Sequence, residues 1–430
     1  MQESPKELVA RHLDEDRVLD LLRASIQTPS VTGSERGYAN LLGEAMREMG
    51  FDHSEVLPFA DDRANVWGGL QGAGGGADVM FLGHIDTVSV GDWAQQWAGA
   101  PREDPFGAVV VDGEMTGRGS ADQKAGVVAA IMAMDLIKRS GVRLKGDVTG
   151  VFVADEEGGE PGSATGQSLG IKACVIEIEA GRIPSADFAV YTEPTTLQVY
   201  TAQMGFLTAD ITVHGQSAYF GMPWLGRDAL RQAHVLLSRL WDYSDGLWEA
   251  ARHPLIERPF VLVTGVQAGG LVAVPGEAVI SLIQKILPGQ SLDEAQAGLG
   301  DLLKAAAVRD GIQATIEYTS PRDHPAGGTP AELIGENPHA ATLQRALRTV
   351  APDRGGVEGA PYWSEMSFTQ RQLGIPTVYC GPGDISCCHT ADERVSVREV
   401  IQATEAFALF ILETCGVEPE MSRTPSKEML

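Results

Sequence analysis

The sequence predicts an α/β protein in which helices flank a mostly parallel central sheet, with a second, α+β domain inserted into the chain. In the first half, short apolar runs alternate with helical segments, an order that is typical of parallel sheets. The pattern changes near residue 205, where apolar and polar side chains begin to alternate as they do in half-exposed strands. Helix and strand patterns return after residue 330, which indicates that one domain interrupts another.

The elements of the main domain follow from hydrophobic periodicity. Helices are predicted where apolar residues recur at three- and four-residue spacing, and strands where short apolar runs end at loops. The predicted helices cover residues 16–29, 36–49, 124–139 and, after the insertion, 337–350. The predicted strands cover residues 79–82, 147–154, 187–192 and 376–380.

The inserted region has two β-containing halves, each with a helix. Its predicted elements are strands at residues 206–213, 259–266, 277–285 and 312–318 and helices at residues 227–241 and 292–309. Residues 320–330 are rich in Pro and Gly and are predicted to be a linker. We therefore assign residues 1–204 and 321–430 to a discontinuous main domain and residues 205–320 to the insertion. The tail after Gly416 is expected to be disordered.

The composition argues against several classes of partner. The chain has 58 acidic and 33 basic residues and a formal net charge of −25, so its surface should repel nucleic acid and anionic membranes. No apolar run approaches the ~18 residues that a membrane span needs, and the N-terminus lacks the basic and apolar regions of a signal peptide. An odd set of five cysteines favours reduced thiols. We expect a cytoplasmic protein whose partner is a small-molecule substrate.

Metal-binding residue types occur at five places, and four of these follow a predicted strand. The places are Gly83-His84-Ile85-Asp86, Ser120-Ala121-Asp122, Asp155-Glu156-Glu157, Glu193-Pro194, and Gly381-Pro382-Gly383 running on to His389. Since the carboxyl ends of parallel strands meet at one edge of a sheet, these loops can bring their side chains together. Three consecutive acidic residues directly after an apolar run are unusual unless a cation meets them.

These donor types suit a pair of divalent cations. Imidazole and carboxylate are good ligands for zinc, manganese or cobalt ions, and one carboxylate can bridge two ions ~3.5–4 Å apart. The adjacent Glu156 and Glu157 can divide the tasks of proton acceptor and metal ligand. Asp86, two residues after His84, can hold the far side of that imidazole. The sequence does not decide between these metals, or between two ions and one tightly bound ion.

Taken in order, the motifs resemble those of the M20 family of metallopeptidases and deacylases, over residues 16–413. That family includes acetylornithine deacetylase, succinyl-diaminopimelate desuccinylase and carboxypeptidase G2. The resemblance implies a metal-binding catalytic domain and an inserted lid through which the chain forms a homodimer or a higher homo-oligomer. Ser364 and Glu365 look most like the acetylornithine deacetylase branch and are implied to contact substrate.

The resemblance also implies a role for each matching ligand. His84, Asp122 and Glu193 are expected to hold one ion. Asp122, Glu157 and His389 are expected to hold the other, so that Asp122 bridges the two.

Three further features are implied by the same resemblance. Glu156 is expected to be the general base, and Asp86 is expected to orient His84. The peptide bond between Asp122 and Gln123 is expected to be cis.

The inserted region departs from the family pattern at residues that recognise substrate. Tyr219 stands where the family usually has a histidine that reaches the partner's active site and stabilises an oxyanion. The usual asparagine before Val274-Pro275 and the usual arginine in the next strand are also absent, and that strand carries Gln284-Lys285. Either the Tyr219 hydroxyl donates a hydrogen bond in place of the histidine, or the substrate differs and the Tyr219 ring suits a flat molecule.

The leading hypothesis is a metal-dependent hydrolase that cleaves a C–N bond of a small molecule with metal-activated water, by default in the deacylation of an N-acyl amino acid. A second hypothesis is the hydrolytic deamination of an activated aromatic amine, as in 5-nitroanthranilate aminohydrolase, a relative with this fold. A third is a catalytically silent binding protein on the same scaffold.

Overall fold

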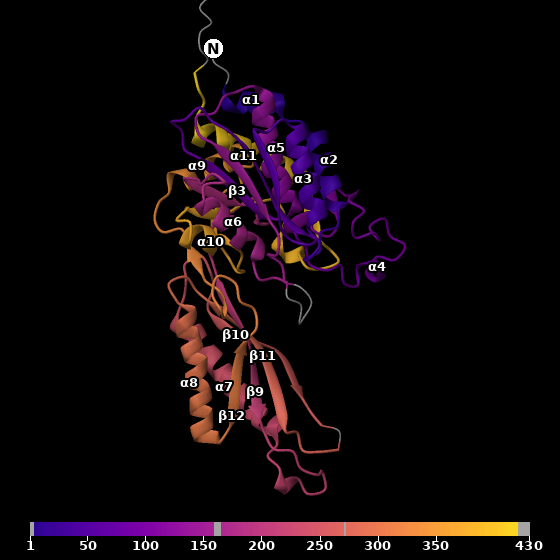
Figure 1. The fold of residues 1–430 in the computed structure, drawn as a ribbon, viewed down its shortest axis with the longest axis vertical. Helices are drawn as coiled ribbons and strands as arrows, with labels where there is room; N and C mark the ends of the chain where they lie inside the picture. The colour runs from indigo at the N-terminus through magenta and orange to yellow at the C-terminus, as the bar shows by residue number, and fades with distance from the viewer. Residues whose placement is uncertain (1–3, 159–164, 271, 420–430) are drawn as a thin grey trace, which may run out of the picture.

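The chain folds into two parts that differ in shape. The computed structural model describes residues 4–158, 165–270 and 272–419. Figure 1 shows a broad upper part, in which helices surround a sheet, and an elongated lower part with its own sheet and long helices. Within the described ranges, no helix is both long enough and apolar enough to cross a membrane. The tail that we expected to be disordered lies outside the described residues from residue 420 onward.

In the described part of the chain, nine strands form the central sheet of the upper part, in the order β1-β2-β6-β3-β7-β16-β8-β14, with β15 paired to β8. Their bounds are β1 His53–Ala60, β2 Arg63–Leu70, β3 Val79–His84, β6 Val148–Val153, β7 Phe188–Tyr191, β8 Val199–Gln203, β14 Ala331–Glu332, β15 Val357–Ala360 and β16 Thr377–Tyr379. The inner strands β6, β3, β7 and β16 are parallel, whereas β2 and β8 pair with them antiparallel. This arrangement confirms the predicted α/β class with a mostly parallel central sheet.

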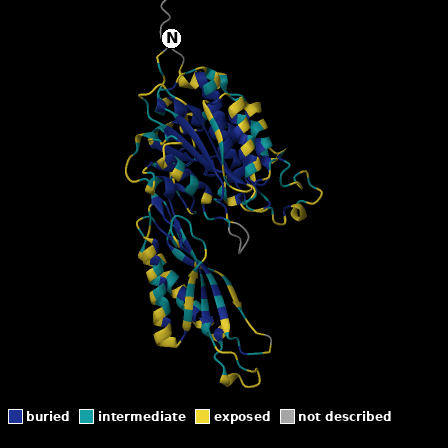
Figure 2. Ribbon diagram, in the orientation of Figure 1, coloured by how far each residue is buried: buried dark blue, intermediate teal, exposed yellow. Residues whose placement is uncertain are grey.

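Helices cover both faces of this sheet. Their bounds are α1 Pro5–His12, α2 Glu15–Ile26, α3 Arg36–Glu48, α5 Ala125–Ser140, α6 Leu169–Glu179, α9 Pro338–Val350, α10 Met366–Arg371 and α11 Val397–Cys415. Phe81 of β3 packs in a core with α3, α5, α9 and α11, while its neighbours Met80 and Leu82 belong to a second core with α6 and α10. Since successive strand side chains point to opposite faces, the two cores lie on opposite sides of the sheet. Figure 2 shows the strands between them as buried.

A smaller sheet and a short helix lie at the edge of the upper part. The helix is α4 Trp93–Gln96, and the strands are β4 Val109–Val111, β5 Glu114–Thr116 and β17 Arg394–Ser396, in the order β17-β5-β4. Met115 and Val395 of this sheet share an apolar cluster with α2 and the first turns of α5. The sheet therefore fixes both the segment before α5 and the segment after residue 389.

The lower part contains a second sheet in the order β10-β11-β9-β12, with β13 paired to β9. The bounds are β9 Gly205–His214, α7 Ala229–Ala250, β10 Phe260–Ala268, β11 Glu277–Ile286, α8 Leu292–Asp310, β12 Gln313–Tyr318 and β13 Gly327–Gly328. Alternate residues of β9 are buried, in a core shared with α7 and α8. The segment 320–330, predicted as a linker, instead carries β13, because its glycines allow close pairing with β9. The domain boundaries at residues 205 and 320 stay a prediction.

The chain returns to the upper part through a closely packed crossing. Gly327 lies against β9, and a Cβ atom there would fall 2.0 Å from the carbonyl oxygen of Phe206. A Cβ atom on Gly328 would fall 2.3 Å from the ring of Trp363 in the upper part. Since only a glycine fits at such distances, the returning chain is held between β9 and Trp363.

Replacing Phe81 by alanine tests the larger core. Phe81 is fully buried, and its ring centroid lies 5.1 Å from that of Phe407 and 6.4 Å from that of Phe410. We expect Phe81→Ala to lower the free energy of unfolding by about 3–5 kcal/mol, measured by chemical denaturation. Val308→Ala, at a position 87% exposed on α8, is the control and should change it by less than about 0.5 kcal/mol. An unchanged denaturation midpoint for Phe81→Ala would overturn this description of the core.

Candidate metal centre

Five metal-binding side chains gather at the carboxyl edge of the parallel strands. His84 ends β3, Glu157 lies in the loop after β6, and Glu193 follows β7. Asp122 precedes α5, and His389 lies on the loop after β16. Because these four strands are parallel, their carboxyl ends bring the loops to one edge of the sheet.

His84, Asp122 and Glu193 form the first candidate ligand set, and all three are buried. Nε2 of His84 lies 2.9 Å from Oδ1 of Asp122, and one ligand atom from each residue lies within 4.8 Å of the others. Nδ1 of His84 lies 2.9 Å from the backbone carbonyl oxygen of Asp86. When Nδ1 donates to that carbonyl, Nε2 presents its lone pair to the ligand set.

Asp122, Glu157 and His389 form the second set. Nε2 of His389 lies 2.9 Å from Oε1 of Glu157 and 3.2 Å from Oδ2 of Asp122. Asp122 thus faces His84 with one carboxylate oxygen and His389 with the other. A carboxylate shared in this way has the form of a bridging ligand. The Asp122-Gln123 peptide bond is cis.

The clustered acids raise the proton affinity of both histidines. Hydrogen bonds to Asp122 and Glu157 raise the pKa of His389 to about 11. Burial acts to lower the pKa of His84, but Asp122 and Glu193 outweigh it and place that pKa well above its usual value. Burial also raises the pKa of the Glu157 and Glu193 carboxyls. Since ligands must lose their protons to bind a metal, divalent cations would replace the protons held here.

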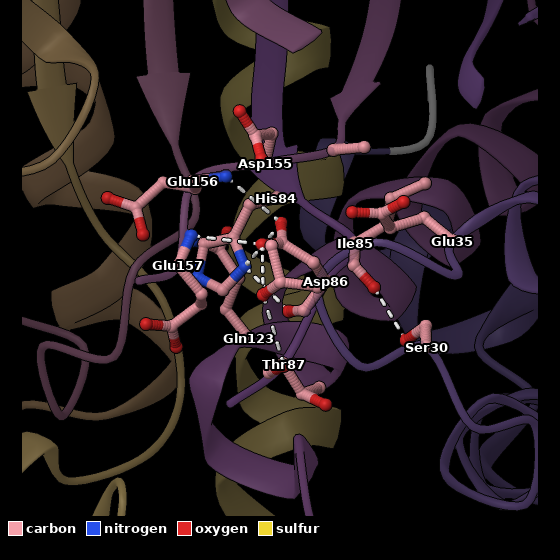
Figure 3. A network of polar contacts seen from close by, with 12 residues as sticks. Ser30, Glu35, His84, Ile85, Asp86, Thr87, Gln123, Asp155, Glu156 and Glu157 are labelled. Atoms are coloured by element: carbon pink, nitrogen blue, oxygen red, sulfur yellow. Dashed lines mark hydrogen bonds and ion pairs between the residues drawn. The ribbon is translucent and has the colours of Figure 1, made fainter. Parts of the chain in front are cut away.

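Asp86 holds the ligand loops in a way that the sequence did not predict. One carboxylate oxygen of Asp86 lies 3.7 Å from Nδ1 of His84, and the Asp86 backbone carbonyl oxygen lies nearer, at 2.9 Å. The carboxylate accepts hydrogen bonds from the backbone amides of Glu156 at 3.2 Å and Glu157 at 2.9 Å, and from the Thr32 hydroxyl at 2.9 Å. Figure 3 shows the two amide contacts. Asp86 therefore ties the loop after β3 to the loop after β6.

Glu156 lies beside the ligand sets with a free carboxylate. The residue is half-buried, and its carboxylate has no hydrogen-bond partner in the described part of the chain. One of its oxygens lies within 4.8 Å of ligand atoms of His84 and Glu157. Burial raises the pKa of the Glu156 carboxyl, and the nearby His84 lowers it. A carboxylate in this position can exchange a proton with a molecule bound at the ligand sets.

Glu393 anchors the loop that carries Asp122. Its carboxylate accepts hydrogen bonds from the backbone amides of Ala121 at 3.2 Å and Asp122 at 3.1 Å, and it forms a buried ion pair with Arg118. We did not predict this residue from the sequence. The available signal was its position four residues after His389, in the same motif.

Asp155, the first residue of the acidic triplet, has a structural role. Arg63 donates to Asp155 and to Glu35, with a nitrogen–oxygen distance of 2.6 Å in each case. Asp155 also accepts hydrogen bonds from the backbone amides of Gly166 and Leu169. Figure 3 places Asp155 and Glu35 beside the network of Asp86. This buried ion pair fixes the start of the loop that carries Glu156.

The three predicted substrate contacts lie in different places. The Ser364 hydroxyl donates to Glu193 at 2.7 Å, so it positions a candidate ligand. Glu365 is fully buried, and one carboxylate oxygen accepts from the Tyr191 hydroxyl at 2.9 Å while the other has no partner among the described residues. Tyr219 is 60% exposed and follows the far end of β9, whose ten residues span ~30 Å. The structure therefore does not bring Tyr219 to the ligand sets of its own chain.

The donor chemistry fits two divalent cations. Each set combines one imidazole with two carboxylates, which suits zinc, manganese or cobalt ions. Two such ions would carry four positive charges, against the four carboxylates of Asp122, Glu156, Glu157 and Glu193. Without cations, these buried or half-buried carboxylates would repel one another at a high free-energy cost.

Comparison with known proteins identifies a family and several relatives. The family model described as peptidase family M20/M25/M40 matches residues 80–413. A succinyl-diaminopimelate desuccinylase from Alkalilimnicola ehrlichii is 28% identical over 391 residues, with 89% of this chain and 95% of the relative covered. One from Paracidovorax citrulli is 24% identical over 398 residues, with 89% and 94% covered. An M20 family metallo-carboxypeptidase from Sulfolobus solfataricus shares the fold, with a TM-score of 0.74, 17% identity, and 92% of this chain and 98% of that chain covered.

Replacing Glu393 by glutamine tests the anchoring of Asp122. We expect Glu393→Gln to weaken zinc binding about 10- to 100-fold, because an uncharged amide leaves Arg118 unpaired and holds the Asp122 loop less firmly. Metal content after dialysis against graded chelator measures the effect. Glu413→Gln, which breaks an exposed pair with Arg345, is the matched control. Equal zinc retention in the two variants would show that Glu393 does not position the ligand.

Proposed function

The chain belongs to peptidase family M20/M25/M40, and on that premise we propose that it deacylates an N-acyl amino acid with two divalent cations. Hydrolysis of a carbon–nitrogen bond is the reaction class that goes with the family. The observation that carries the finer proposal is the pair of ligand sets that share Asp122, with the free carboxylate of Glu156 beside them.

In this proposal, the chain's own residues divide the chemistry. The bound cations would supply Lewis acidity, which makes an attacking water more acidic and stabilises negative charge on the carbonyl oxygen. Glu156 accepts the proton that the water loses and then donates it to the leaving nitrogen, so the amide bond breaks to a carboxylate and an amine. Asp86 keeps Glu156 in place through its backbone amide.

The similarity to desuccinylases supports an amide substrate. The relatives from Alkalilimnicola ehrlichii and Paracidovorax citrulli are named for the removal of a succinyl group, and nearly their whole length is covered. At 28% and 24% identity they support the removal of an acyl group and leave the acyl group itself open.

A second candidate function is the hydrolytic deamination of an activated aromatic amine. The observation that favours it is the loop after β9, where the Tyr219 and Phe220 rings lie 4.6 Å apart between centroids, tilted by 56°, and both residues are more than half exposed. Trp224 of the same loop is 74% exposed. Aromatic faces of this kind suit a flat substrate, and the oxyanion histidine usual in the family is absent here.

The same loop supports a proposed homodimer through the lower part of the molecule. Phe220, Trp224 and Leu225 expose 54%, 74% and 58% of their surface within a few residues of one another. Clustered exposed apolar side chains are typical of protein interfaces. Because Tyr219 lies far from the ligand sets of its own chain, a dimer is also the arrangement in which this loop could meet an active site.

A cytoplasmic location is proposed from the cysteine chemistry. All five cysteines are free and buried. Unpaired thiols are the rule in reducing compartments.

Replacing Glu156 by glutamine tests the proposed base. We expect kcat on an N-acetyl amino acid to fall about 10²- to 10⁴-fold while metal content stays the same, because glutamine cannot accept the proton of the attacking water. Glu179→Gln, on the exposed end of α6, is the control for loss of a carboxylate outside the ligand sets. Retained turnover by Glu156→Gln with both metals bound would remove Glu156 from this role.

A substrate panel separates the two candidate functions. We expect release of acetate or succinate from N-acyl amino acids, detected by chromatography, and no ammonia from nitroaminobenzoic acids. Ammonia released from an aromatic amine by the wild-type protein, but not by Glu156→Gln, would instead support deamination.

A further inference from the structure

An open cavity lies at the edge of the upper part, between the loop that follows β3 and the small sheet β17-β5-β4. Its volume is about 580 Å³, within the range of ~300–1,000 Å³ that small-molecule sites occupy. Its lining includes three residues of the loop and three of the small sheet, which are Trp97, Pro101, Arg102, Val111, Glu114 and Arg394. Figure 1 shows the loop, with α4, projecting from the side of the upper part. No residue of the two candidate ligand sets lines this cavity.

Arg102 supplies the cavity with a cation that is fixed in position but not closely paired. Its guanidinium carbon lies 3.3 Å from the ring centroid of Trp97, and the indole N–H of Trp97 donates to the carbonyl oxygen of Ala391 at 2.6 Å. Among the described residues, the guanidinium makes no hydrogen bond, and the half-exposed carboxylate of Asp392 lies 3.9 Å away. Because a guanidinium stacked on a ring keeps its N–H edge free, Arg102 can donate to a ligand.

The sheet side of the cavity carries a net negative charge. The carboxylate of Glu114, on β5, forms an ion pair with Arg394 of β17, with a nitrogen–oxygen distance of 2.8 Å. Arg394 also donates to the carbonyl oxygen of Asp392 at 2.8 Å. Asp112, in the turn between β4 and β5, lines the cavity as well, and its carboxylate has no partner in the described part of the chain. Two carboxylates and one guanidinium therefore stand on this side.

The cavity borders both segments that carry the second candidate ligand set. Strand β5 ends at Thr116, six residues before Asp122, and β17 begins at Arg394, five residues after His389. Arg394 and Thr116 are paired in the register of the two strands. The hydrogen bond from Trp97 reaches the same segment between His389 and β17. A molecule in the cavity would therefore contact the frame of the metal centre and none of its ligands.

We propose that this cavity is a second binding site, for a small zwitterion such as a free amino acid with an apolar side chain. The proposal goes beyond the proposed function and does not depend on it. The carboxylate of the zwitterion binds the guanidinium of Arg102, and its ammonium group binds the carboxylate of Glu114. Val111 and Pro101 offer apolar contact to the side chain. A simple anion would meet the carboxylates and a simple cation would meet Arg102, so a molecule with both charges fits best.

Calorimetric titration of the metal-loaded full chain with L-leucine tests the site. The matched probes are 4-methylpentanoate, which is leucine without the ammonium group, and 3-methylbutylamine, which is leucine without the carboxylate. We expect L-leucine to bind about 10-fold more tightly than either probe, because each probe lacks one charged contact. L-leucine that binds no more tightly than the better of the two probes would overturn the proposal.

Two variants show whether binding occurs in this cavity. Arg102→Gln should weaken binding of L-leucine and 4-methylpentanoate about 10-fold, and Glu114→Gln should weaken binding of L-leucine and 3-methylbutylamine by a similar factor, with metal content unchanged in both. Arg258→Gln, which removes a guanidinium stacked on Trp248 at 5.0 Å, is the matched control and should change none of the affinities. Equal L-leucine affinity in wild type and Arg102→Gln would place the bound amino acid outside the cavity and contradict the proposal, whatever the turnover.

Discussion

Five buried or half-buried carboxylates converge at one edge of the central sheet, and their mutual repulsion is the constraint on which the rest of the structure depends. They are Asp86, Asp122, Glu156, Glu157 and Glu193. In a region shielded from water, each uncompensated charge costs several kcal/mol, so the arrangement is stable only with cations or bound protons. The nearby carboxylates raise the pKa of both histidines, so that protons bound there offset part of the negative charge. Divalent cations would offset more of it, because they would place positive charge between the carboxylates.

Hydrogen bonds between carboxylates and backbone amides hold the loops around the ligand sets together despite this repulsion. Asp86, from the loop after β3, holds the amides of Glu156 and Glu157, while Glu393, near His389, holds the amide of Asp122. Each anchor belongs to a different loop from the residues that it fixes. The candidate ligands therefore keep their separations although Glu157, Glu193 and His389 lie in loops, and the free carboxylate of Glu156 stays beside them.

The parts that the sequence could predict are those with a local signal. His84, Glu157 and Glu193 follow apolar strands, and the parallel order of those strands implies that they meet. Contacts between distant positions left no such signal, as in the bond from Ser364 to Glu193 across 171 positions. Spacing placed Asp86 near His84 but could not show that its backbone carbonyl lies closer to the ring than its carboxylate does. Strands β1 and β2 were not predicted, because proline and paired glycines interrupt their patterns.

The number of divalent ions bound per chain shows whether the two ligand sets that share Asp122 hold two cations. The protein would be stripped with chelator and titrated with zinc or manganese, and the bound metal would be counted after equilibrium dialysis. We expect two ions per wild-type chain and weaker binding at both sites together in Asp122→Asn. Fewer than half an ion per folded wild-type chain, or two ions bound with unchanged affinity in Asp122→Asn, would contradict this expectation.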